Sequence, residues 1–100
     1  MMIKQVIYRN SKWLDAVKSI EYCVLCGCYC QTQPAHRNEG KGMGMKTDDC
    51  ACAALCNQCH YQIDNGKELT REERRILLDK AIVLTIIQLA RRGKIGVMKA

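Results

Sequence analysis

The most regular pattern of hydrophobic positions lies in the last third of the chain. Thr70 and Glu73 form a capping box, which predicts a helix that runs to about Arg92 and stops at Gly93. Hydrophobic residues then recur at helical spacing, and we expect them to face the core. They are Ile76, Leu77, Ala81, Leu84, Ile87 and, at the end, Ala90.

Further hydrophobic residues broaden the apolar face of this predicted helix, which covers about residues 71–92. They are Ile82, Val83, Ile86 and Leu89. A face this wide is either well buried or partly covered by another subunit. A homo-oligomer through the C-terminal helix is therefore one expectation.

Shorter elements are expected in the first half. Residues 2–8 alternate weakly, which suits an edge strand or an ordered arm. Asn10 or Ser11 can cap a helix that runs to about Ser19. Residues 31–49 are polar and glycine-rich, which predicts a long loop with room for short flanking strands. Residues 50–55 are small and apolar and suit a strand, while Asn65-Gly66 indicates a turn.

Eight cysteines are the strongest compositional feature of this 100-residue chain. Cys23 and Cys26 form one Cys-x-x-Cys pair, and Cys56 and Cys59 form another. Two such pairs suit a closed tetrahedral zinc site, and a chain this small benefits from a metal cross-link. The first ten residues do not read as a signal peptide, which favours reduced thiols over disulfides.

The other four cysteines leave alternatives open. Cys28 and Cys30 follow the first pair closely, and either could replace one of its members. The matching two-residue gap favours Cys23 and Cys26. Cys50 and Cys52 are most simply small buried hydrophobic residues.

Charge and hydropathy limit the classes of function. Sixteen Lys and Arg against ten Asp and Glu give a formal charge of +6, which suits a polyanionic partner such as DNA but also an ordinary solvated surface. No apolar run reaches the roughly twenty residues needed to span a bilayer. We expect a soluble, intracellular protein.

The two histidines lie in informative places. If a helix begins at the second cysteine pair, His60 and Asp64 share a face turned away from Cys59. His36 and Asn38 open the long loop, and the basic residues of the same stretch are Arg37, Lys41 and Lys46. Each has a simpler explanation: a histidine beside the zinc or at the surface, a turn-capping asparagine, an aspartate at a helix end or in a salt bridge, and a solvated basic loop.

These motifs, in this order, resemble the zinc-stapled branch of the HNH, or ββα-metal, endonucleases, and more narrowly small phage and prophage nucleases of the YbcO type. The resemblance covers about Cys23 to Arg75. It implies a zinc-stabilised HNH-like core at about residues 20–66. The length of the chain predicts one domain over residues 1–100, so the expected α+β fold has this core, an N-terminal helix and a long C-terminal helix at about 71–92. The segments that carry it are Cys23-Val24-Leu25-Cys26, Ala35-His36-Arg37-Asn38, Gly40-Lys41-Gly42-Met43-Gly44, Leu55-Cys56-Asn57-Gln58-Cys59-His60 and Ile63-Asp64.

The resemblance also implies roles. His36 would be the general base, Asn38 would orient it or the loop, and His60 would hold a catalytic Mg²⁺ or Mn²⁺. Asp64 would bind the same ion or hold the His60 ring. Ala35 stands where many HNH enzymes carry an acidic ligand. The ion therefore uses fewer protein ligands, or Asp64, Asp48 or Asp49 substitutes, or the site is degenerate.

Two functions follow as expectations. One is a metal-dependent DNA endonuclease or nickase of phage or prophage origin, acting in the bacterial cytoplasm with little sequence preference and using Arg37, Lys41 and Lys46 as phosphate contacts. The other is a non-catalytic zinc module that binds nucleic acid or protein on the same scaffold. Only the nuclease requires His36 and His60 to face each other across an open site.

Overall fold

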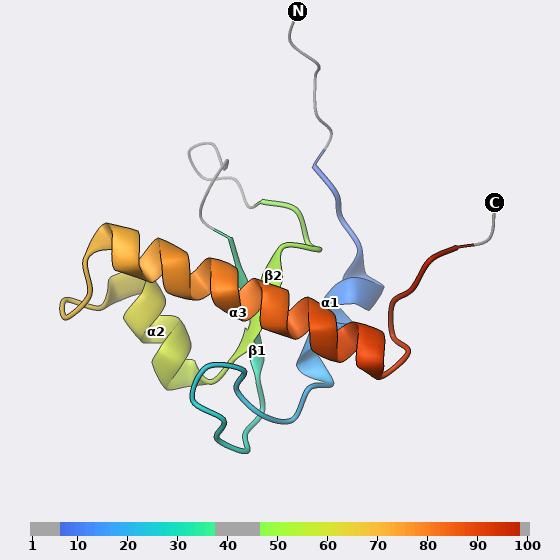
Figure 1. Cartoon of the computed structure of the whole chain (residues 1–100), viewed down its shortest axis with the longest axis horizontal. Coiled ribbons are helices and arrows are strands. Elements are labelled where there is room, and N and C mark those ends of the chain that lie inside the picture. The colour runs from blue at the N-terminus through green and yellow to red at the C-terminus, as the bar shows by residue number, and fades with distance from the viewer. Residues whose placement is uncertain (1–6, 38–46, 99–100) are drawn as a thin grey trace, which may run out of the picture.

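The computed structural model describes residues 7–37 and 47–98, which form an α+β arrangement of three helices and one two-stranded sheet. In chain order these are α1 (Ser11–Lys18), β1 (Gln33–His36), β2 (Cys52–Leu55), α2 (Asn57–Asn65) and α3 (Arg71–Arg91). The long α3 crosses the hairpin, with α2 beside its first half and α1 beside its second half (Figure 1). No helix among residues 7–37 and 47–98 is long and apolar enough to cross a membrane.

The helix ends agree with the sequence signals. The Asn10 side chain accepts a hydrogen bond from the Trp13 amide and caps α1. Thr70 and Glu73 make both bonds of the capping box at the start of α3. Cys56 caps α2, so a helix does begin at the second cysteine pair. Residues 7 and 8 are not in a strand, and the rest of the arm predicted over residues 2–8 lies outside the described residues.

The hairpin is antiparallel, with Gln33 opposite Leu55 at one end and His36 opposite Cys52 at the other. All four residues of β2 are buried. Ala53 and Leu55 belong to one hydrophobic cluster, and Cys52 and Ala54 belong to another. This division follows from the alternation of side chains along a strand, and it allows β2 to organise both halves of the core.

The backbone of Ala54 is bonded from outside the sheet. Its amide donates to the Thr85 hydroxyl of α3 at 3.0 Å, and its carbonyl accepts the Val24 amide at 3.1 Å. Both groups point away from Pro34, the partner of Ala54 in the hairpin, to the outer edge of β2. Thr85 and Val24 therefore satisfy a buried edge that would otherwise be left unpaired.

The core-facing side of α3 differs from the expected one. The residues buried on α3 are Leu78, Ala81, Ile82, Thr85 and Leu89. Of the predicted core positions Ile76 is 62% exposed, Ile87 is 38% exposed and Ala90 is also exposed, so the prediction was wrong for these three. The helix is rotated so that the Thr85 hydroxyl reaches the Ala54 amide. The spacing of hydrophobic residues does not predict this polar contact.

Candidate metal centre and histidine sites

The first cysteine pair lies in a tight turn between α1 and β1. The amide of Gly27 donates to the carbonyl of Cys23 at 2.8 Å, and the amide of Cys23 donates to the carbonyl of Cys28 at 2.9 Å. Gly27 has a φ of 76°, which a residue with a side chain rarely adopts. Gly27 therefore allows the chain to turn tightly after Cys26.

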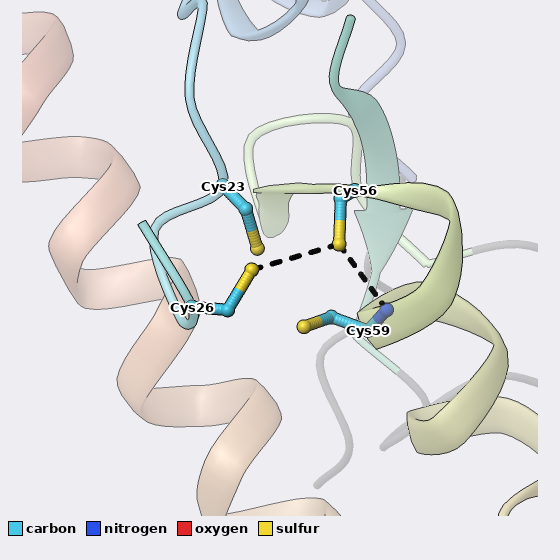
Figure 2. A group of neighbouring side chains, drawn as sticks. All are labelled: Cys23, Cys26, Cys56 and Cys59. Atoms are coloured by element: carbon cyan, nitrogen blue, oxygen red, sulfur yellow. Dashed lines mark hydrogen bonds between the residues drawn. The ribbon is translucent and has the colours of Figure 1, made fainter. Parts of the chain in front are cut away.

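The second pair lies at the start of α2, and the two pairs face each other across the end of the hairpin (Figure 2). Cys56 is the N-cap of α2, and its sulfur accepts the Cys59 amide at 3.4 Å. Helix geometry then places Cys59 in the first turn, so both sulfurs point to the same side. Four thiols from segments 30 residues apart in sequence thus meet at one point.

The spacing of the four sulfurs fits a tetrahedral zinc ion. The Sγ atoms of Cys23, Cys26, Cys56 and Cys59 all lie within 4.8 Å of one another, and those of Cys26 and Cys56 are 3.8 Å apart. Zinc–sulfur bonds of about 2.3 Å in a regular tetrahedron give sulfur–sulfur distances of about 3.8 Å. These four residues could therefore hold a metal such as zinc, as the sequence predicted.

The pKa shifts of the thiols in this group also favour binding of a cation. Burial opposes ionisation of Cys56, but the Cys59 amide and the neighbouring thiols donate to its sulfur and lower its pKa to about 7. Burial and the neighbouring sulfurs raise the pKa of Cys59. The Cys56 thiolate therefore forms readily, whereas ionisation of Cys59 is opposed by burial and by the neighbouring sulfurs. A bound divalent cation would stabilise all four thiolates.

The remaining cysteines are not part of this group. Cys28 is exposed, Cys30 and Cys50 are half-buried, and Cys52 is fully buried. Cys52 packs with Val17, Ile20, Ala54 and Leu89, as expected of a small core residue.

His60 lies on α2, one residue after the second pair. Its Nδ1 is 2.9 Å from Oε1 of Gln33, and its Nε2 is 3.1 Å from Oδ2 of Asp64. If Nδ1–H donates to the Gln33 amide oxygen, Nε2 directs a lone pair at a carboxylate oxygen. Two such atoms at this distance repel unless a proton or a metal ion lies between them. The predicted pair is therefore brought together, with Gln33 as a partner that the sequence did not indicate.

His36 lies at the other end of β1. Its Nε2 is 3.0 Å from Oδ1 of Asp49, whose side chain is only 7% exposed. The Asp49 carboxylate also accepts a hydrogen bond from the Asn10 amide at 2.7 Å and forms an ion pair with Arg9 at 3.4 Å. Burial opposes ionisation of Asp49, but these donors and the Arg9 charge lower its pKa on balance. An ionised carboxylate only accepts, so Nε2 of His36 carries the hydrogen and Nδ1 is its basic nitrogen.

The described structure does not bring the two histidines together. Gln33, which contacts His60, and His36 are three positions apart on β1, so their side chains point to opposite faces, with Cα atoms about 10 Å apart. Apart from the four thiols, residues 7–37 and 47–98 contain no group of three or more His, Cys, Asp or Glu side chains placed to share a metal ion.

The other predicted residues have varied surroundings. Arg37 donates to both carboxylate oxygens of Asp79, at 2.8 and 3.2 Å. Asp48 accepts the Tyr8 amide at 2.7 Å. Three predicted residues lie outside the described residues: Asn38, Lys41 and Lys46.

Comparisons with protein-family models, with curated proteins and with solved structures found no match. The conclusion that the geometry supports is a four-cysteine centre that could bind a metal such as zinc, at one end of a small α+β fold.

Proposed function

We propose that this chain is a metal-dependent DNA endonuclease or nickase in which the four-cysteine centre fixes the helix that carries the catalytic cation. The observation that carries the proposal is the 3.1 Å separation of Nε2 of His60 and Oδ2 of Asp64. Adjacent ligands of an octahedral Mg²⁺ with bonds of about 2.1 Å lie about 3.0 Å apart. The two donor atoms are therefore spaced as one such ion requires.

The surroundings of His60 support the same assignment. Gln33 contacts Nδ1, as the outer partner of a metal-binding histidine usually does, and so directs Nε2 to the ion. The side chains of His60 and Asp64 are 28% and 43% exposed, which leaves access for a phosphate group. A bound Mg²⁺ or Mn²⁺ would stabilise negative charge on the scissile phosphate and the leaving oxygen.

His36 is the proposed general base. With Nε2–H directed at Asp49, its Nδ1 can accept a proton from water, and the resulting imidazolium is stabilised by the buried carboxylate. This role requires the substrate, or a movement of the hairpin and α2, to bring His36 and His60 to one phosphate. The +6 charge supports binding of DNA through its backbone, with affinity that falls steeply as salt rises.

The second candidate is a non-catalytic zinc module that binds nucleic acid or protein. It is favoured by the placement of His36 and His60 at opposite ends and on opposite faces of β1. In this alternative the His60–Asp64 pair shares a proton rather than a metal ion, and the His36–Asp49 pair only stabilises the fold.

Nicking of supercoiled plasmid in Mg²⁺ or Mn²⁺ separates the two candidates. We expect His36→Ala to abolish nicking while divalent-metal binding, measured by calorimetry, stays nearly unchanged. We expect His60→Ala to weaken metal binding and nicking together, with four-thiolate zinc retained. Tyr61→Ala, at an exposed neighbour on α2, is the control and should nick normally.

Other outcomes would contradict the nuclease. Full nicking by either histidine variant would remove that residue from the site, and absence of nicking by the wild type would favour the zinc module. Loss of zinc in the His60 variant would assign His60 to the structural centre. Selective broadening of the His60 ring signals by Mn²⁺ in NMR spectra would test the cation site independently of cleavage.

A further inference from the structure

The outer face of α3 is more apolar than a monomer's surface requires. Ile76 and Val83 are 62% and 56% exposed, and Ile86 and Ile87 are 37% and 38% exposed. Positions 76, 83, 86 and 87 share one side of the helix, opposite the side that packs on β2. The stripe extends over most of a 21-residue helix, which is about 30 Å long.

This face continues into a groove beside α3. A hollow of about 170 Å³ lies between Leu84 and Ile87 of α3 and the segment that contains Tyr22 and Val24. A larger hollow of about 470 Å³ is lined by Leu77 of α3, together with residues of α2 and of the first cysteine turn. Leu77 and Lys80 line the larger hollow, and Leu84 follows Lys80 one turn later on the same flank, so the two hollows follow one another along the helix.

The charges on this face indicate what covers it. Within the stripe lie Glu72, Asp79 and Lys80, and Asp79 is paired with Arg37, so the charges on this face balance although the chain carries +6. A face without net charge gives no electrostatic preference for a polyanion such as DNA. Glu73 and Arg91 lie 18 residues apart, which is five whole turns, so they occupy the same flank at opposite ends of α3.

We propose that α3 of a second copy lies antiparallel along this face, forming a two-fold symmetric dimer. Antiparallel packing sets Glu73 opposite the partner's Arg91, and two-fold symmetry makes the same pair twice. Parallel packing would instead set Arg91 against the partner's Arg91. The two copies of Ile76, Val83 and Ile87 then bury one another and cover the groove. This inference does not depend on the proposed nuclease activity.

The test is the molar mass of the wild-type protein in solution, measured by sedimentation equilibrium. One chain is 11.4 kDa, so a dimer has about twice that mass. We expect Val83→Glu to weaken dimerisation by about 100-fold or more, because it places two carboxylates at the centre of an apolar contact. Val97→Glu is the matched control, because Val97 is fully exposed and lies beyond α3, and it should stay dimeric.

A charge variant tests the orientation. Arg91→Glu sets acidic residues opposite each other at both ends and should weaken the dimer by about 3- to 10-fold, whereas Lys12→Glu on α1 should not. Glu73 is left unchanged because its carboxylate also caps α3. Circular dichroism confirms that each variant is folded. A wild-type monomer at about 200 µM, which excludes all but weak association, or a Val83→Glu protein that stays dimeric, would overturn the proposal.

Discussion

The two ends of the β1–β2 hairpin are closed by different chemistry. At the Gln33–Leu55 end, four thiols from two distant segments converge. At the His36–Cys52 end, Asp49 binds His36, Asn10 and Arg9, which lie 13 to 40 residues away in the sequence. Both ends join distant parts of the chain, which is how a small fold with a short sheet resists opening.

The difference between the two ends is where the positive charge comes from. The carboxylate end contains its own cation and amide donors, and it is complete without any ligand. The thiol end is a group of four sulfurs that could hold a metal ion, and such an ion would supply the positive charge that stabilises its thiolates. Metal removal should therefore affect only the thiol end, and acid should affect the carboxylate end through Asp49.

The largest expected effect comes from the thiol end. Removal of zinc by a chelator, or Cys56→Ser, should abolish the cooperative thermal transition, because structural zinc contributes roughly 10 kcal/mol or more to small zinc domains. Metal analysis should find one zinc per chain in the wild type. Cys50→Ser, at a half-buried cysteine outside the group, is the control and should keep its zinc. An unchanged melting curve for Cys56→Ser would show that the thiols do not stabilise the fold.

An intermediate effect is expected at the carboxylate end. Asp49→Asn should lower the free energy of unfolding by about 2–4 kcal/mol, because a buried acceptor of three donors loses its charge. The folded pKa of Asp49 is lowered, so its contribution is complete above the unfolded pKa and is lost as pH falls through the lower folded value. The difference between wild type and variant, measured by urea unfolding, should therefore shrink below about pH 4. A constant difference across pH would contradict this account.

The smallest effects compare the two histidines. His36→Ala should cost about 1–2 kcal/mol, because it removes a partner from a carboxylate that is 7% exposed. His60→Ala should cost less than about 0.5 kcal/mol, because its partner Asp64 is one helical turn away and 43% exposed. Urea unfolding of both variants at pH 7 makes the comparison. Equal losses of unfolding free energy in the two variants would show that the greater burial of Asp49 does not strengthen its contact with His36.

The local features of this fold were predictable from short stretches of sequence. The Asn10 cap, the Thr70–Glu73 capping box, the turn at Gly27 and the helix that starts at Cys56 each depend on residues within a few positions of one another. The four-cysteine group was predictable as well, because two Cys-x-x-Cys pairs restrict the chemistry strongly.

The rotation of α3 was not predictable in this way. Hydrophobic residues surround this helix on most sides, so periodicity gives no single answer. The amide of Ala54 donates to Thr85, which places this face of α3 against β2 and leaves Ile76 and Ile87 outside. The partners of His36 and His60 depend likewise on where β1 is placed against Asp49 and α2. Contacts between segments 13 or more residues apart form only when the whole chain packs, and local sequence does not encode them.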